Sequence, residues 1–222
     1  MDAIEATFDV HGFERVTAIL SHEEVAVVSA SLSSIAEARN LLDSAWCKAL
    51  AHRIRQHPIV AAALHSAPAC VQCTYFEKNE HRNWLVALHQ DLAVPAKERV
   101  EHALLKAWSR KDGQHFVQAP TTLLDQLVAV RLHIDACDVE NGPLRLVAGS
   151  HQYGKLSSDR STTLRNQWGE IVCTANAGDA LLMRPLVLHA SSKAIVPNRR
   201  RVLHFLFGPA FPGYGLQWPH AA

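Results

Sequence analysis

The stretch Trp84-Leu85-Val86-Ala87-Leu88-His89-Gln90-Asp91-Leu92 is the segment around which the rest of the chain can be arranged. Its apolar first half predicts a short β-strand, and this strand ends in a His-x-Asp pair. Because side chains alternate between the two faces of a strand, His89 and Asp91 should point to the same side, together with Leu85 and Ala87. An imidazole and a carboxylate in this arrangement can both reach one metal ion.

A second histidine from another part of the chain would complete a set of two histidines and one carboxylate. That set, with the opposite face of the metal open, is typical of non-heme Fe(II) oxygenases. The pair occurs twice, as His89-Gln90-Asp91 and as His133-Ile134-Asp135, and both lie on predicted strands, so alternation cannot choose between them. For either pair alone, a histidine hydrogen-bonded in the core or at a rim is the more ordinary interpretation.

The composition is typical of a globular enzyme. At 222 residues the chain can bury one core of generous size, and we expect a single domain over residues 1–222. The formal net charge is +1 and Arg199-Arg200-Arg201 is an isolated basic run, which argues against nucleic acid or an anionic membrane as the main partner. No apolar run approaches the length of about 18 residues that a transmembrane helix needs.

Cysteine usage and the opening residues favour a reducing, cytoplasmic setting. The five cysteines are an odd number, and the chain opens without a basic and then apolar signal segment. Cys70-Val71-Gln72-Cys73 is a lone CxxC without a second pair to complete a zinc site, so both cysteines are predicted to be buried thiols.

Residues 1–66 predict a helical layer that precedes a sheet. The expected elements are an extended entry over 8–20 and helices over 22–33, 44–55 and 58–65. The first helix opens with a capping box, in which the Ser21 hydroxyl caps the turn and Glu24 reaches back. Pro58 ends the second helix, because a proline cannot donate the next backbone hydrogen bond.

From residue 70 onwards the pattern changes to short apolar strands separated by turn signals. The predicted strands are 70–77, 84–89, 127–135, 144–148, 170–174, 180–188 and 201–207. The excursion 92–126 is too long for a hairpin loop and should wall or cover a site; its middle, 95–108, has helical character, and Lys111-Asp112-Gly113 predicts a turn. Many short strands after a helical layer favour a sandwich or small barrel over 70–208.

Two further features give the metal hypothesis its context. His189 follows the long apolar stretch 180–188, and Arg200 lies eleven residues later, at the start of another apolar strand. A dicarboxylate co-substrate needs a fixed cation deep in the barrel, and arginine binds a carboxylate through two parallel hydrogen bonds.

Several segments together carry a resemblance to a known family. They are Asn83-Trp84-Leu85-Val86, Leu88-His89-Gln90-Asp91-Leu92, Arg131-Leu132-His133-Ile134-Asp135, Glu140-Asn141-Gly142-Pro143-Leu144-Arg145, Gly149-Ser150-His151, and the block from Gly178 through His189-Ala190-Ser191-Ser192 to Arg200-Arg201-Val202-Leu203-His204. In order and spacing, from about Gly12 to Gly208, the chain resembles the phytanoyl-CoA dioxygenase family of Fe(II)/2-oxoglutarate oxygenases. The resemblance implies a mainly β fold with a helical N-terminal layer, built as a double-stranded β-helix (a jelly-roll, cupin-like barrel).

The resemblance also implies which residues bind the metal. In this family the first His-x-Asp carries the iron, so His89, Asp91 and His189 would bind Fe(II). His133 and Asp135 would then not be ligands.

The co-substrate site follows from the same resemblance. Arg200 would hold the distal carboxylate of 2-oxoglutarate, helped by the hydroxyl of Ser191. Other implied residues are Gln90, Arg131, Asn83 and Lys78 near the co-substrate, and His133 and Trp84 near the substrate. Arg199 and Arg201 are alternatives to Arg200, but alternation places Arg200 on the face of Val202 and His204. His151 is expected to be a loop residue, and His204 a hydrogen-bonded barrel histidine.

The expected activity is that of an Fe(II)- and 2-oxoglutarate-dependent dioxygenase that uses O2 to hydroxylate a small molecule, with release of succinate and CO2. Related halogenases lack the carboxylate ligand, so Asp91 favours oxygenation. The alternatives are a cupin-type metalloprotein (an isomerase or a metal-binding regulator) that does not use 2-oxoglutarate, and a barrel that binds a ligand without catalysis. The substrate cannot be read, and nothing in Glu98–Leu105 indicates a CoA thioester.

Overall fold

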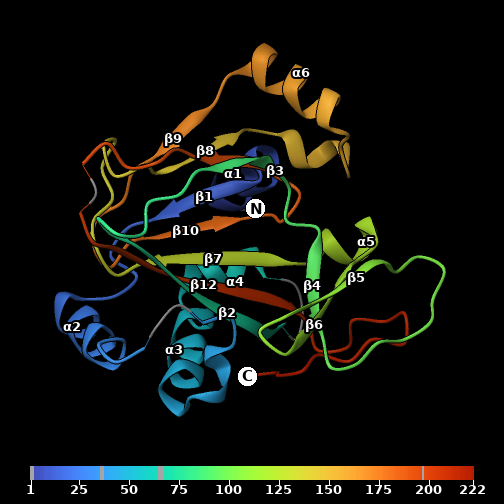
Figure 1. The fold of residues 1–222 in the computed structure, drawn as a ribbon, viewed down its shortest axis with the longest axis horizontal. Coiled ribbons are helices and arrows are strands. Elements are labelled where there is room, and N and C mark those ends of the chain that lie inside the picture. Colours follow the sequence, from blue (N-terminus) through green and yellow to red (C-terminus); the bar gives the residue numbers. More distant parts are fainter. Residues whose placement is uncertain (1–2, 36–37, 65–67, 197) are drawn as a thin grey trace.

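The computed structural model describes residues 3–35, 38–64, 68–196 and 198–222. Two antiparallel sheets form the centre of the molecule (Figure 1). The larger sheet has the order β1-β10-β7-β12-β2, with β1 Phe13–Val16, β10 Ala180–Met183, β7 Val128–His133, β12 Arg200–Pro209 and β2 Pro68–Lys78. The smaller sheet has the order β3-β11-β8-β9, with β3 Val86–His89, β11 Leu188–Ser191, β8 Leu144–Val147 and β9 Ile171–Cys173. The sheets are not closed into one hydrogen-bonded barrel.

A helical layer covers the outer face of the larger sheet, as predicted. Its elements are α1 Ala3–His11, α2 His22–Ser31, the 3-10 turn η1 Leu41–Asp43, α3 Ala45–Arg55 and α4 Pro58–Ala63. The capping box at α2 is present, since the Ser21 hydroxyl accepts from the Glu24 amide and the Glu24 carboxylate accepts from the Ser21 amide. Residues 65 and 66, where the third helix and the helical layer were predicted to end, lie outside the described residues, as does Pro197.

Alternate residues of the central strands divide between two cores. On β12, Leu203, Phe205 and Phe207 pack with apolar residues of the helical layer. The intervening Leu206 packs between the two sheets with residues such as Leu146 of β8. The space between the sheets is therefore reached by every second residue of each strand, and this is where the functional side chains lie.

The prediction of one strand over 180–188 was wrong. β10 ends at Met183 and β11 begins at Leu188, and the two strands belong to different sheets. Arg184–Val187 makes the crossing, closed by a hydrogen bond of 3.0 Å from the Val187 amide to the Arg184 carbonyl. Both strands are buried on both faces, so the apolar run shows no periodicity that would reveal the break. The first part of 8–20 also differs, because α1 runs to His11 before β1 begins.

The predicted helical character of 95–108 was also wrong. The excursion forms a small sheet of order β4-β6-β5, with β4 Ala93–Ala96, β5 Lys106–Lys111 and β6 Gln114–Gln118, followed by the short helix α5 Thr121–Leu124. This sheet lies at one end of the two main sheets, on the right in Figure 1. The turn at Asp112 and Gly113 is where the sequence placed it, and both residues have positive φ (50° and 79°).

Two short elements between β8 and β9 were not predicted, namely the 3-10 turn η2 Ser150–Tyr153 and the helix α6 Ser158–Trp168. On α6 only Ser161 and Leu164 are buried, so the sequence of this helix shows no apolar stripe. Cys70 and Cys73 are buried free thiols, as predicted. In the described part of the chain, no helix combines the length and the apolar character that crossing a membrane requires.

Candidate metal centre

His89 and His189 are brought together by the pairing of two neighbouring strands. β3 and β11 run antiparallel in the smaller sheet, and their register places His189 opposite His89. The two ring centroids lie 4.1 Å apart, with an angle of 52° between the ring planes. Strands almost one hundred residues apart in sequence thus present two imidazoles at one point.

Backbone carbonyls fix the orientation of both rings. Nδ1 of His89 lies 2.8 Å from the carbonyl oxygen of Ala87, and Nδ1 of His189 lies 3.0 Å from that of Val187. Since a carbonyl can only accept, each Nδ1 carries the proton and donates it. When the ring is neutral, its Nε2 therefore carries a lone pair, which is the form that binds a metal.

Asp91 supplies the third ligand atom. It lies beyond the end of β3, where its amide donates to the Pro185 carbonyl over 2.8 Å. Its Oδ1 lies 3.5 Å from His89 Nε2, and its Oδ2 lies 3.7 Å from His189 Nε2. The three ligand atoms lie within 4.8 Å of one another, which among the described residues singles out this group as able to hold a metal ion. The donor set fits the two-histidine, one-carboxylate iron site.

The electrostatics of the triad agree with this assignment. Burial by itself would raise the pKa of the Asp91 carboxyl, but His189 and His89 outweigh it and hold that pKa below its usual range. Burial lowers the pKa of His189. It acts in the same direction on His89, where hydrogen bonding to Asp91 prevails and raises the pKa. A divalent cation would replace the protons that the carboxylate now attracts.

The second His-x-Asp pair is not arranged to bind a metal. Asp135 forms hydrogen bonds of 2.8 and 2.6 Å with the Arg201 guanidinium. His133 is buried and lines a small cavity beside Arg15 and Asp179 rather than the large one described next. Burial and the charge of Arg131 lower the pKa of His133 to about 3, so the imidazole is neutral. Its predicted contact with substrate stays a prediction.

A cavity of about 470 Å³ opens beside the triad, between the two sheets and the β4-β6-β5 sheet. Its lining includes the predicted residues His89, Gln90, Asp91, His189, Ser191, Lys78, Trp84, Arg131 and Arg200. Sequence reasoning missed Gln72, Thr74 and Phe76, although they alternate on β2 with Lys78 and so share its face. It also missed the contribution of the excursion, because that segment was expected to be helical.

Arg200 and Lys78 lie at one end of this cavity. They are paired in register across β12 and β2, and both side chains are buried, at 4% and 2% exposed. Arg200 Nη1 donates to the carbonyls of Gly142 and Asn141, while its Nε has no hydrogen-bond partner in the described part of the chain. Lys78 Nζ donates to the Ser192 carbonyl over 2.9 Å and to the Ser191 hydroxyl over 3.4 Å.

Arg131 is a third cation in the same space. Its guanidinium lies 5.5 Å from the centre of the Phe76 ring, and it is paired in register with His204. Burial, together with the charge of Arg200, lowers the pKa of Arg131 to about 10 and that of Lys78 to about 8. None of the ion pairs formed by the described residues involves these three cations, so their charge is available to an anionic ligand.

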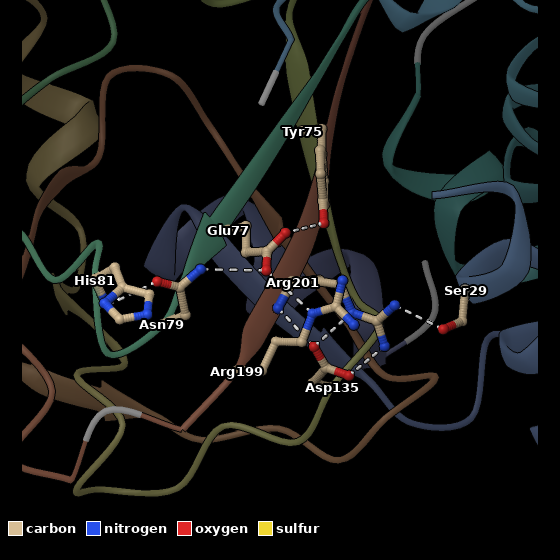
Figure 2. A network of polar contacts seen from close by, with 8 residues as sticks. All are labelled: Ser29, Tyr75, Glu77, Asn79, His81, Asp135, Arg199 and Arg201. Carbon is tan, nitrogen blue, oxygen red and sulfur yellow. Dashed lines mark hydrogen bonds and ion pairs between the residues drawn. The ribbon is translucent and has the colours of Figure 1, made fainter. Parts of the chain in front are cut away.

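The two neighbours of Arg200 form ion pairs with acidic side chains and stabilise the fold (Figure 2). Arg201 binds Asp135 and also donates to the Ser29 hydroxyl of α2 over 2.6 Å. Arg199 forms a 3.0 Å ion pair with Glu77, which accepts a 2.6 Å hydrogen bond from Tyr75. This network ties the helical layer to the larger sheet and leaves Arg200 as the arginine of the run that faces the cavity.

The remaining predicted residues form hydrogen bonds with the surrounding loops. The side-chain Nε2 of Gln90 donates to the carbonyls of Gly154 and Leu186, and its side-chain Oε1 accepts from the backbone amide of Leu156 over 2.8 Å. Asn83 makes two 2.8 Å hydrogen bonds with the backbone of Ala194 and is not among the lining residues. The contacts of Asn83 and Gln90 with a co-substrate stay predictions.

The structure tests the predictions for His151 and His204. His151 lies in η2, where Nε2 is 3.1 Å from the Asp9 carbonyl, as expected for a loop histidine. His204 lines the cavity and its Nδ1 is buried without a hydrogen-bond partner among the described residues, so the expectation of a hydrogen-bonded barrel histidine was wrong. Burial lowers the pKa of His204 to about 4 and keeps the ring neutral.

A family model and solved structures agree with this architecture. A family model described as Phytanoyl-CoA dioxygenase (PhyH) matches residues 3–202. No curated protein sequence matches the chain. The fold is similar to HygX from Streptomyces hygroscopicus with nickel and 2-oxoglutarate bound (TM-score 0.64, 16% identity, 95% of this chain and 88% of that chain covered).

Two further structures share the fold. EctD from S. alaskensis in its apoform has a TM-score of 0.70 at 17% identity, with 95% of this chain and 78% of that chain covered. The non-heme alpha ketoglutarate dependent carbocyclase SnoK from nogalamycin biosynthesis has a TM-score of 0.68 at 15% identity, with 97% and 88% covered. These likenesses confirm the predicted fold class, a double-stranded β-helix with a helical N-terminal layer.

Proposed function

Since the chain belongs to the phytanoyl-CoA dioxygenase family, we propose that it is an Fe(II)- and 2-oxoglutarate-dependent oxygenase acting on a small molecule. The observation that carries the proposal is the register of β3 and β11, which sets His89 opposite His189 beside Asp91. A structural brace or a ligand-binding barrel would not need two histidines with fixed Nδ1 protons and free Nε2 atoms at one point.

The three ligand residues would hold Fe(II), and the buried cations would hold 2-oxoglutarate. We assign the distal carboxylate to Arg200, because its Nη1 is oriented by two backbone carbonyls while its Nε lacks a partner. Lys78 and Ser191, which are already in contact, would complete this end of the site. Arg131, which lines the same cavity, would face the co-substrate beside them.

Iron with bound 2-oxoglutarate supplies oxidative decarboxylation and activation of O2, and the rest of the reaction depends on what this chain positions. The fixed cations would orient the dianion without reorganisation. Succinate and CO2 are the expected co-products. We propose hydroxylation as the outcome, because Asp91 occupies the third ligand position. The carbocyclase SnoK has the same fold, so the fold alone does not set the outcome.

A stability measurement tests the proposal without a known substrate. Mn(II) and 2-oxoglutarate together should stabilise the protein against heat more than either alone, by roughly 2.7 kcal/mol at a hundred times the dissociation constant. Asp91→Ala should abolish the Mn(II) effect and succinate release. Stabilisation by metal without any effect of 2-oxoglutarate would indicate the cupin-type alternative, and no effect of either would indicate a non-catalytic barrel.

A further inference from the structure

The cavity lining is strongly unbalanced in charge. Five cations line it, namely Arg39, Lys78, Lys111, Arg131 and Arg200, whereas Asp91 is the one carboxylate among the described lining residues. Of these cations, Arg39 has an acidic partner, Asp112, at 3.1 Å. The positive charge inside the cavity is therefore not neutralised by the protein.

The proposed iron and co-substrate do not remove this excess. Fe(II), the Asp91 carboxylate and the two carboxylates of 2-oxoglutarate together leave one negative charge. Lys78, Arg131 and Arg200 are buried or half-buried and contribute three positive charges to the same space. Cations in a low-dielectric cavity are unfavourable without a counter-charge, so the cavity keeps a net positive charge that attracts a further anion.

Two further cations at the cavity mouth add to this positive charge. Lys111 is the last residue of β5, its side chain is exposed, and yet it lines the cavity, which places it at the entrance. Its Nζ lies 5.5 Å from the centre of the Phe116 ring, which also lines the cavity. Arg39, from the segment between α2 and η1, lies at the same mouth, held there by Asp112 of the β5–β6 turn. Cations at the entrance of a cavity raise the local electrostatic potential and attract anions.

The remaining lining offers apolar surface. Val94, Phe116, Leu127, Leu144, Met183 and Leu206 all face the cavity. Such a surface binds hydrocarbon, while the cations at the entrance bind a charged group. The two halves of the site thus select a molecule with an apolar body and an anionic group.

We propose that the substrate is an organic acid with an apolar body, whose carboxylate or phosphate group is bound at the cavity mouth by Lys111. This inference rests on the proposed function, because the apolar body would then lie between that anion and the iron. Lys111 has no acidic partner among the described residues, whereas Arg39 is shared with Asp112, so Lys111 is the entrance cation free to bind a ligand.

The experiment uses protein saturated with Mn(II) and 2-oxoglutarate and three probes of similar shape: phenylacetate, phenylacetamide and benzylphosphonate. Dissociation constants are measured by calorimetry for the wild type, for Lys111→Gln, and for Lys106→Gln as a matched control. Lys106 is the first residue of β5 and is also exposed, but it does not line the cavity. The 2-oxoglutarate affinity of each protein is measured in the same series.

We expect the acids to bind more tightly than the amide. Lys111→Gln should weaken the acids roughly two- to fivefold, as for one exposed ion pair, and should leave the amide unchanged. Lys106→Gln should change neither. The tighter of the two acids identifies carboxylate or phosphate as the recognised group.

Equal affinity for acid and amide, binding of neither, or equal effects of the two lysine substitutions would overturn the substrate assignment. Failure of the wild type to bind Mn(II) and 2-oxoglutarate would instead refute the proposed function, so the two failures are distinguishable.

Discussion

Replacing Arg200 by glutamine tests the assignment of the co-substrate site. The side chain is 4% exposed, lies in register with Lys78 and has a partnerless Nε, so it is prepared to donate to a carboxylate. Hydrogen bonds between charged groups contribute about 1.5–3 kcal/mol each. Loss of one such contact should raise the dissociation constant of 2-oxoglutarate roughly 10- to 150-fold. Lys78 remains at the same end of the cavity and should preserve weak binding.

The assay is titration of the Mn(II)-loaded protein with 2-oxoglutarate, followed by calorimetry. Arg199→Gln is the matched control, because Arg199 is the preceding residue, does not line the cavity and is paired with Glu77 (Figure 2). It should leave the affinity for 2-oxoglutarate unchanged, while Mn(II) affinity should be the same in all three proteins. An Arg200→Gln protein that is folded and binds 2-oxoglutarate as tightly as the wild type would refute the assignment.

Three further predictions concern pH, stability and backbone. The pKa of Lys78 is lowered to about 8, chiefly by burial, so its ammonium form is lost as the pH rises through that value. The affinity for 2-oxoglutarate should therefore fall over the same pH range in the wild type but not in Lys78→Met. Titrations with 2-oxoglutarate at a series of pH values measure this difference. Arg201→Ala should lower the free energy of unfolding, measured in urea, by about 2–4 kcal/mol, because Asp135 is left without its partner. Arg199→Ala should lower it by less than about 1 kcal/mol, because the Arg199 side chain is 52% exposed. Equal losses would contradict the structural role assigned to Arg201. Gly142→Ala should destabilise the protein by roughly 1–3 kcal/mol, because φ of Gly142 is +62° and an added Cβ would meet the backbone. It should also weaken 2-oxoglutarate binding, because the Gly142 carbonyl accepts a hydrogen bond from Arg200. Unchanged binding would show that this loop does not position the Arg200 guanidinium.

Local signals were enough to predict α2, α3 and α4 and to pick out the two candidate His-x-Asp pairs. The capping box at Ser21, the proline after Arg55 and the alternation that separates Arg200 from Arg201 each depend on neighbouring residues. The choice of the first His-x-Asp over the second did not come from such signals. In the structure the two pairs differ by their partners, since Asp135 is occupied by Arg201 and Asp91 is not.

The errors occurred where the pairing of strands decides the structure. The run 180–188 is apolar on both faces, so the crossing at Arg184–Val187 leaves no mark in the pattern. The segment 92–126 forms strands because β4 and β5 both pair with β6, and such pairing can override a local helical pattern. The entrance role of Lys111 depends on that sheet and could not be read from the sequence.

The proposed activity depends on the convergence of two imidazoles and one carboxylate beside a buried guanidinium. A crystal structure grown without oxygen, with Mn(II) and 2-oxoglutarate, tests it most directly. We predict metal density bound by Nε2 of His89, Nε2 of His189 and the carboxylate of Asp91, with the distal carboxylate of 2-oxoglutarate on Arg200. Metal bound elsewhere, at His133 for example, or a co-substrate that does not reach Arg200, would contradict the account.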